Sequence, residues 1–295
     1  MRILVTGACG LLGSHLLSFL SGRHETAGID RHPWWGDDSV QLLQGELEDL
    51  SFVRKTLREL APELLIHCAA LADVEACERD PVRASACNAG LTRGLLSCFT
   101  EGMRMLYIST DAVFSGENSF SPETEEPRPK TAYGRSKLEG EREVQRAGPN
   151  HLIVRTNFYG WSSGRKKTSA EWMHESLRTK SPVTLFEDFF FTPIYVVDLA
   201  EGLAALAGQR RQGLFHVAGK DRVSKYEFGK LLSQEAGFSM EAVQTGSRLK
   251  DLSLDSSRFR RQTGLCSPEV RPGLVRFLRD RDQPLHQRFE KACPT

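Results

Sequence analysis

A tyrosine and a lysine four positions apart are the side chains in this sequence best placed for proton transfer. Tyr133 and Lys137 begin a segment that predicts a helix, and residues four apart share one helical face. An ammonium beside a phenol would lower the pKa of the phenol from about 10 toward neutrality, making Tyr133 a usable acid or base. Ser109, Thr110 and Asp111 end a predicted strand, where ligands bind in α/β folds. A surface Tyr–Lys pair is the alternative interpretation.

A glycine-rich turn near the start of the chain could hold a dinucleotide. Residues 7–13 read GACGLLG and lie between an apolar run and a helical pattern. The first glycine would allow the tight turn, the second the approach of a pyrophosphate, and the third close packing of helix on strand. The helix N-terminus would then face the phosphates. The residues expected to touch the cofactor at this turn are Gly7, Cys9, Gly10, Leu11, Leu12 and Gly13.

An acidic residue follows at the position expected for ribose binding. The next predicted strand ends at Asp30, near the offset of about 20 residues typical of a dinucleotide fingerprint. Its carboxylate would accept hydrogen bonds from the adenosine ribose and repel a 2′-phosphate, which favours NAD. Arg31 and His32 come next, and a cation there could instead hold the extra phosphate of NADP. NAD and NADP both remain open.

The elements that must position these groups alternate between strand and helix. Short apolar runs predict strands at residues 3–6, 26–30, 40–44, 64–69, 105–109 and 152–156. Helical spacing predicts helices at residues 11–20, 51–60 and 84–99. Near-continuous apolar strands that alternate with helices are typical of a parallel sheet covered on both faces. The predicted fold class is therefore α/β, a doubly wound parallel sheet of the Rossmann type.

The second half of the chain predicts a smaller lobe. After residue 160 the alternation weakens, with helices expected at residues 172–177, 224–235 and 272–281 and a strand-like segment at 189–197. We expect residues 1–160 to form the NAD(P)-binding domain, with 193–218 returning to it. Residues 161–192 and 219–295 would form a substrate-binding lobe over the carboxyl edge of the sheet.

Composition narrows the class of protein. The chain has 295 residues, of which 40% are hydrophobic and 26% charged, as in soluble globular proteins. A net charge of +1 argues against nucleic-acid binding, and no apolar run approaches the roughly 18 residues of a membrane span. The seven cysteines form no CxxC pair and have no metal-ligand spacing. We expect a cytoplasmic protein with reduced thiols and no metal site.

Six segments occur in the order found in the extended short-chain dehydrogenase/reductases: GACGLLG, HCAALADVEACE, STDAVF, YGRSK, RTNFYG and FTPIYVVDLA. Within that superfamily the chain resembles the dTDP-4-dehydrorhamnose reductase family, on the STDAVF and VEACE segments. The resemblance covers residues 1–280. It implies reduction of a keto group on a deoxysugar, expected to be nucleotide-linked, with NADH or NADPH as cofactor.

The resemblance also implies roles for individual residues. Tyr133 would protonate the substrate carbonyl, Lys137 would bind the nicotinamide ribose and keep the phenol acidic, and Thr110 would hold the carbonyl oxygen. Asp111, Asn157 and Phe158 would contact the sugar or nicotinamide. The further cofactor residues are Glu46, Leu47, Cys68, Ala69, Ala70, Leu71 and Ser109, with Tyr133 and Lys137.

Two departures from the family pattern leave the identity of the sugar substrate undecided. Ala112 stands where the family usually has an aromatic residue, and Asn157–Phe158 replaces a serine–tryptophan pair, so the sugar could differ from 4-dehydrorhamnose. Phe191 ends a run of three phenylalanines that could wall a substrate pocket, although such a run more often lies in a core.

The alternative functions are a nucleotide-sugar epimerase, a dehydratase, or a non-catalytic dinucleotide-binding regulatory subunit like that of methionine adenosyltransferase. Ala112 argues against a 4,6-dehydratase because it cannot donate the proton that elimination needs. The oligomeric state is open, a homodimer among the options.

Overall fold

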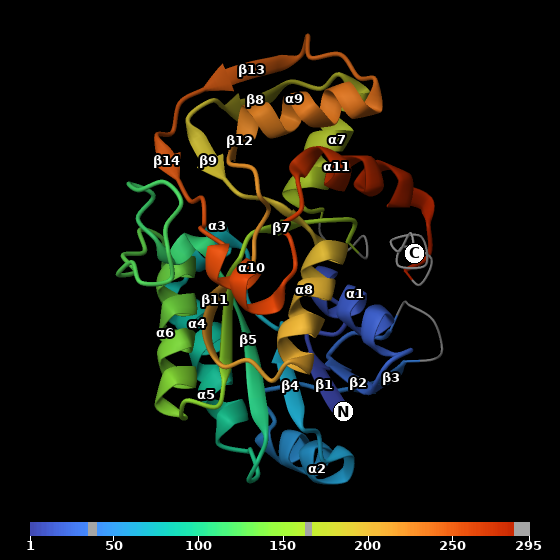
Figure 1. Cartoon of the computed structure of the whole chain (residues 1–295), viewed down its shortest axis with the longest axis vertical. Helices are drawn as coiled ribbons and strands as arrows, with labels where there is room; N and C mark the ends of the chain where they lie inside the picture. The colour runs from blue at the N-terminus through green and yellow to red at the C-terminus, as the bar shows by residue number, and fades with distance from the viewer. Residues whose placement is uncertain (35–39, 163–166, 286–295) are drawn as a thin grey trace.

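The computed structural model describes residues 1–34, 40–162 and 167–285 and is built on a seven-stranded parallel sheet (Figure 1). The strands are β1 (Arg2–Thr6), β2 (Glu25–Asp30), β3 (Gln41–Gln44), β4 (Leu64–His67), β5 (Arg104–Thr110), β6 (Leu152–Thr156) and β11 (Gly213–His216). Their order is β11-β6-β5-β4-β1-β2-β3. The predicted fold class is confirmed. All six predicted strands are present, and β11, which no strand pattern indicated, extends the sheet beside β6.

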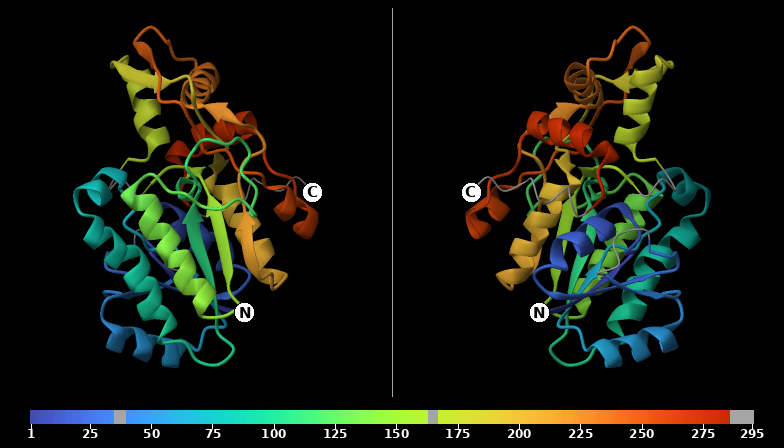
Figure 2. Two further views of the ribbon diagram at one scale, coloured as in Figure 1. Left: turned by 90° about the vertical axis from the view of Figure 1, so that its left-hand side faces the viewer. Right: turned by 90° about the vertical axis from the view of Figure 1, so that its right-hand side faces the viewer.

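Helices cover both faces of the sheet (Figure 2). One face packs against α1 (Leu11–Leu20) and α8 (Val196–Gly208), and the other against α2 (Leu50–Leu60), α5 (Leu91–Leu96) and α6 (Ala132–Arg146). Successive residues of β1 point to opposite faces of the sheet. Ile3 and Val5 pack in the core with α1 and α8, and Leu4 packs in the core on the other face. Burial on both faces explains why the central strands β1, β4 and β6 are mostly apolar.

Two predicted elements are divided. Residues 84–99 form no single helix but α4 (Pro81–Ser85), the π-helical turn η1 (Ala86–Gly90) and α5, preceded by α3 (Val74–Arg79). The strand-like segment 189–197 contains β9 (Phe189–Phe191) and β10 (Ile194–Tyr195), and α8 begins at its end. Pro193 lies between the two strands, where its missing N–H interrupts pairing.

The second half of the chain supplies a lobe above the carboxyl end of the sheet (Figure 1). Its elements are β7 (Phe158–Tyr159), α7 (Ser169–Thr179), β8 (Val183–Phe186), β12 (Val223–Ser224), α9 (Lys225–Ala236), β13 (Val243–Gly246), β14 (Lys250–Asp251) and α11 (Val270–Arg279). Between β14 and α11, α10 (Ser257–Thr263) returns to pack against β11 and α8. Capping boxes start α7 at Thr168 and α9 at Ser224, each with a glutamate three residues on. The strand order β12-β9-β14 joins distant segments into one small sheet.

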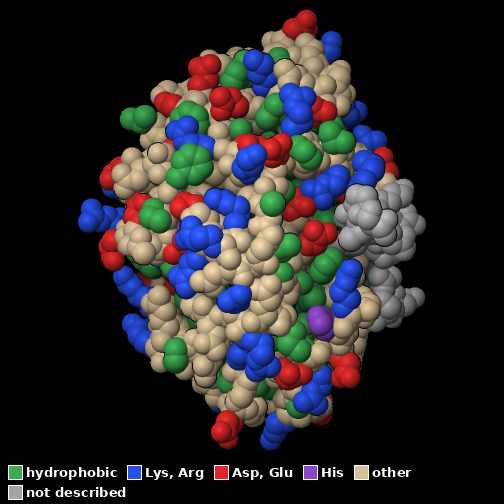
Figure 3. Space-filling model, viewed as in Figure 1, with side chains coloured by type: hydrophobic (Ala, Val, Ile, Leu, Met, Phe, Trp, Pro, Cys, Tyr) green, Lys and Arg blue, Asp and Glu red, His purple; other side chains and the backbone are tan. Residues whose placement is uncertain are grey.

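The described residues carry charges of both signs and no membrane span. Figure 3 shows Lys and Arg side chains spread among Asp and Glu over one face of the molecule. None of the helices in the described part of the chain has the length and apolarity that a bilayer crossing requires. The same residues contain no group of three or more His, Cys, Asp or Glu side chains placed to hold a metal ion.

A buried carboxylate fixes α6 to the sheet. Glu141 is fully buried and accepts hydrogen bonds from Arg155 Nε and Nη2, at 2.9 and 2.7 Å. The Ser109 hydroxyl donates to the same carboxylate. Arg155 lies on β6 and Ser109 on β5, so one side chain of α6 bonds two neighbouring strands. This arrangement sets the depth and rotation of α6 against the sheet.

The first prediction concerns this ion pair. Glu141→Gln should lower the free energy of unfolding by about 3 kcal/mol or more, because it leaves the buried Arg155 guanidinium without a counter-charge. Urea unfolding at constant pH measures the loss. The matched control is Glu175→Gln on α7, whose partner Arg178 is about half exposed, and it should cost less than about 1 kcal/mol. Equal effects of the two substitutions would contradict this role of Glu141.

Candidate active site

The glycine turn after β1 lies where the strand order reverses. Gly7 has a φ of +68°, in the left-handed region that favours glycine. A Cβ at Gly7 would come within 2.7 Å of the Ala69 nitrogen, and one at Gly13 within 2.2 Å of the Gly7 oxygen. Because β1 and β4 flank the reversal, the turn and Ala69 line the crevice in which such sheets bind ligands.

The start of α1 and the end of β2 form a cradle beside this turn. Gly10 caps α1 with extended backbone and no side-chain hydrogen bond, so the helix N-terminus faces the crevice uncapped. The Asp30 carboxylate accepts hydrogen bonds from the backbone N–H groups of Cys9 and His32, both at 2.9 Å. Each carboxylate oxygen keeps acceptor capacity for a ribose hydroxyl. The residues therefore fit a dinucleotide.

The remaining predicted cofactor residues lie along the same edge. Glu46 and Leu47 follow β3, and the adjoining backbone is tied to β2 by a hydrogen bond from Gly45 N–H to the Asp30 carbonyl. Leu71 is held by Asn88, whose side chain accepts from its N–H at 2.8 Å and donates to its carbonyl at 3.2 Å. Arg31 is exposed beside the end of β2.

Asn88 is a residue beside the candidate site that the sequence analysis missed. It lies in η1, is almost fully buried, and its side chain also donates to the Ser136 hydroxyl at 2.8 Å. It thereby joins the segment after β4 to α6. A polar amide inside an otherwise apolar helical pattern was the available signal, and π-helical turns recur at functional sites.

Thr110 and Tyr133 meet at the carboxyl edge of the sheet. Thr110 ends β5, and Tyr133 lies in the first turn of α6, which Thr131 caps by accepting from the Gly134 N–H. Tyr133 is partly exposed, and the Thr110 side chain lies close enough to its hydroxyl to lower its pKa. Burial raises the pKa of Tyr133, Asp111 raises it further, and the Thr110 contact opposes the shift. The phenol is therefore protonated at neutral pH.

Lys137 lies against β5, and it does not lower the pKa of Tyr133 as predicted. Its side chain is buried, and its ammonium lies 4.0 Å from the centroid of the Tyr107 ring. Burial lowers the pKa of Lys137 to about 7, and the nearby Glu141 and Cys68 oppose that shift. Lys137 is not among the described groups that shift the pKa of Tyr133, so the expected lowering of that pKa is wrong. Residues four apart differ by one helical turn, about 6 Å along the axis, which carries Lys137 deeper against β5.

Asp111 and Asn157 form a polar pair next to Thr110. Asp111 is 3% exposed and accepts hydrogen bonds from Asn157 Nδ2 at 2.5 Å and from the Thr110 hydroxyl at 3.0 Å. Burial raises the pKa of Asp111, whereas Asn157 and two lysines of the lobe, Lys225 and Lys250, lower it. The predicted substrate residues Thr110, Asp111 and Asn157 are thus brought together.

Lys225 is the second residue that the sequence analysis missed. It begins α9, and its ammonium lies 3.4 Å from the centroid of the Phe191 ring. Burial lowers the pKa of Lys225 to about 8, and Asp111 opposes the shift. Phe191 is 4% exposed and belongs to the main core, which agrees with the alternative that its run of phenylalanines lies in a core. Phe158 is half-buried. Only the folded chain brings residue 225 beside residue 111.

A parallel doubly wound sheet, a glycine turn at the strand-order reversal and a Thr–Tyr–Lys set at the carboxyl edge define an extended short-chain dehydrogenase/reductase. Residues 1–282 match the family described as RmlD substrate binding domain, and the chain belongs to that family.

Several proteins of known name resemble most of the chain. It is 34% identical to the probable low-salt glycan biosynthesis reductase Agl14 of Haloferax volcanii, over 88% of each chain. It is 32% identical to dTDP-4-dehydrorhamnose reductase of Mycobacterium tuberculosis, over 82% of this chain and 78% of that one. It is 31% identical to methionine adenosyltransferase 2 subunit beta of Danio rerio, over 77% and 71%. The crystal structure of a Bacillus anthracis dTDP-4-dehydrorhamnose reductase in complex with NADP superposes with a TM-score of 0.84, at 26% identity and 95% and 99% coverage.

The second prediction follows from the buried lysine. The pKa of Lys137 is about 7 in the folded protein and 10.5 in its ordinary state, so between these values the folded protein binds fewer protons than the unfolded chain. Stability should therefore rise with pH across this window, and the cost of burying the charge should be fully present below pH 7. Urea unfolding of wild type and Lys137→Met at several pH values isolates the effect of Lys137. The other titrating groups contribute equally to both proteins, so their contributions cancel in the difference.

The expected result is that wild type gains stability relative to Lys137→Met as pH rises from 7 toward 10. Lys230→Met, which removes an exposed lysine of α9, is the control and should leave the wild-type pH profile unchanged. A difference between wild type and Lys137→Met that stays constant or shrinks with rising pH would contradict the charge state assigned to Lys137.

Proposed function

We propose that this protein reduces a keto group on a nucleotide-linked deoxysugar with NADPH or NADH. The contact between the Thr110 and Tyr133 hydroxyls, at the sheet edge that also carries the glycine turn, is the observation that carries the proposal. A protonated phenol beside a second hydroxyl suits a carbonyl oxygen that must be held and then protonated. Two of the named relatives are dTDP-4-dehydrorhamnose reductases, and a third is named a glycan biosynthesis reductase.

The cofactor proposal rests on the cradle at the strand-order reversal. The uncapped N-terminus of α1 and the glycine turn would hold the pyrophosphate, and Asp30 the adenosine ribose. When bound, NAD(P)H supplies the hydride. The other residues proposed to line its path are Cys9, Leu11, Leu12, Arg31, Glu46, Leu47, Cys68, Ala69, Ala70, Leu71, Ser109 and Lys137.

The chemistry proposed for the chain's own side chains is a proton transfer. Thr110 would orient the substrate carbonyl oxygen, and Tyr133 would give that oxygen its phenolic proton as the carbon accepts hydride, which yields an alcohol. The phenolate then regains a proton from solvent. The ammonium of Lys137 would bind the nicotinamide ribose. The raised pKa of Tyr133 supports this role, since a donor must carry its proton at working pH.

The sugar would lie between the sheet and the lobe. Asp111 and Asn157 would hydrogen-bond its hydroxyl groups, with Phe158 against its apolar face. We assign residues 1–160 and 193–218 to the cofactor domain, and 161–192 and 219–295 to the substrate lobe. The approach of Lys225 and Lys250 to Asp111 supports that division, because it places lobe residues at the sheet edge.

The experiment for this proposal is anaerobic mixing of the protein with NADH or NADPH and a panel of 4-keto nucleotide sugars. Loss of nicotinamide absorbance with one of them would support the reductase. The 31% identity to a methionine adenosyltransferase subunit favours one other candidate, a dinucleotide-binding regulatory subunit. That function would be supported if no keto sugar consumed the cofactor, while the protein altered the kinetics of a partner enzyme regardless of Tyr133.

The third prediction is that Tyr133→Phe lowers kcat by about 10²–10⁴-fold and leaves dinucleotide affinity nearly intact. The phenol acts only as the carbonyl oxygen gains charge, so its loss belongs to the transition state. Steady-state kinetics and calorimetry separate the two effects. Thr110→Val should cost less, since it removes one hydrogen bond and not the proton. A Tyr133→Phe protein with most of its activity would exclude Tyr133 as the donor.

The fourth prediction is that Lys225→Gln raises KM for the sugar about tenfold or more, without weakening dinucleotide binding. The substitution removes a cation that stabilises the Asp111 carboxylate, which we propose hydrogen-bonds the sugar, and a hydrogen bond to a charged group is worth about 1.5–3 kcal/mol. Lys230→Gln on the same helix makes the same charge change at an exposed position and serves as control. An unchanged KM in Lys225→Gln would remove Lys225 from the substrate site.

A further inference from the structure

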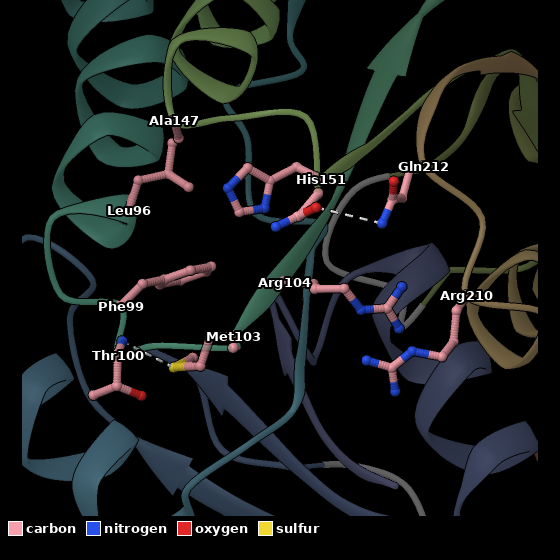
Figure 4. A pocket seen from close by; sticks show the side chains of 11 residues that line it. Leu96, Phe99, Thr100, Met103, Arg104, Ala147, His151, Arg210 and Gln212 are labelled. Atoms are coloured by element: carbon pink, nitrogen blue, oxygen red, sulfur yellow. Dashed lines mark hydrogen bonds between the residues drawn. The ribbon is translucent and has the colours of Figure 1, made fainter.

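A cavity of about 410 Å³ lies at the amino end of the sheet, opposite to the proposed active site (Figure 4). It is lined where β5, β6 and β11 begin and where α5 and α6 end. A volume of this size is within the range of small-molecule sites, about 300–1,000 Å³. None of the roles proposed above uses it.

Two arginines face each other on one side of this cavity. Arg104 begins β5 and is 7% exposed, while Arg210 follows α8 and is exposed. Figure 4 shows their guanidinium groups next to one another. The buried Nη2 of Arg104 has no hydrogen-bond partner among the described residues. Such an orphaned donor costs free energy unless a ligand or water completes it.

The charge around this pair is unbalanced. Burial and the neighbouring Arg210 both lower the pKa of Arg104, and Glu63 opposes them. The Glu63 carboxylate also accepts a hydrogen bond from the Arg2 N–H. No acidic side chain is found among the described residues that line the cavity. Two guanidinium groups with free donors suit an oxyanion, which each can bind through two parallel hydrogen bonds.

The opposite side of the cavity is apolar. Figure 4 shows Leu96 and Phe99 across from the two arginines. The ring of His151 contacts Phe99 edge-on at 6.1 Å and is held by the Met105 N–H, which donates to its Nδ1 at 3.1 Å. The Gln212 amide, which also lines the cavity, donates to the Asn150 side chain at 3.5 Å (Figure 4). The cavity therefore combines an anion-binding end with an apolar, aromatic end.

We propose that this cavity binds a phosphate monoester, with the phosphate between Arg104 and Arg210 and the organic part against Phe99 and Leu96. The guanidinium groups of Arg104 and Arg210 would donate to the phosphate oxygens, and Arg104 would turn its unpartnered, buried Nη2 toward the ligand. Occupancy would be independent of the dinucleotide and the keto sugar, because those ligands are assigned to the carboxyl edge.

The test is calorimetric titration with inorganic phosphate and with phenyl phosphate, on protein already saturated with its dinucleotide so that the cofactor site is filled. Both probes should bind, and phenyl phosphate should bind more tightly because its ring can contact Phe99. Arg210→Gln changes an exposed residue and should weaken both probes at least tenfold. The matched control is Arg211→Gln, because the Arg211 guanidinium is engaged with Gln209 and the Gln262 carbonyl.

Binding that is lost in Arg210→Gln and kept in Arg211→Gln would support the site. Absence of binding at millimolar probe, or equal loss in the two variants, would overturn it. Arg104→Gln should weaken binding at least as much as Arg210→Gln, and its melting temperature without ligand separates a lost site from a lost fold. Equal affinity of the two probes in wild type would overturn the assignment of Phe99 to the organic part.

Discussion

The buried carboxylate of Glu141 is the constraint on which the proposed active site depends. Burying the charges of Glu141 and Arg155 away from water costs free energy. Two hydrogen bonds between them and a third from the Ser109 hydroxyl to Glu141 offset that cost. These bonds join α6 to β5 and β6 at the sheet edge. Thr110 follows Ser109 directly, and Lys137 precedes Glu141 by one helical turn. This ion pair therefore helps to hold α6 in the position that brings Tyr133 near Thr110, together with the Asn88–Ser136 hydrogen bond.

Burial also shifts the pKa values of the ionisable groups at the carboxyl edge of the sheet in opposite directions. It raises the pKa of Tyr133 and lowers those of Lys137 and Lys225, so that Tyr133 keeps its proton while both lysines titrate closer to neutral pH than usual. Asp111, which the lysines of the lobe stabilise, is the counter-charge between sheet and lobe. The site is thus electrostatically joined across two parts of the chain that are distant in sequence.

The sequence predicted those features that depend on local patterns. Apolar runs identified six of the seven sheet strands, and the glycine turn and Thr110 were placed by their position after a strand. Contacts between distant residues were not predictable, including those of Asn88 with Leu71, Glu141 with Arg155, and Lys225 with Phe191. The effect of Lys137 on the pKa of Tyr133 was misjudged for a related reason. Spacing shows which residues share a helical face, whereas the depth of each against the sheet is set by packing.

Isotope transfer tests keto-sugar reduction most directly. The protein would be mixed anaerobically with NADPH or NADH deuterated at the nicotinamide C4 position that donates the hydride, and with a 4-keto-6-deoxy nucleotide sugar. We predict one deuterium at the former carbonyl carbon of the product, seen by mass spectrometry and NMR, and its absence when the same cofactor is deuterated on the opposite face. Failure to transfer deuterium from either face to any sugar of the panel would contradict the assignment of this protein as a keto-sugar reductase.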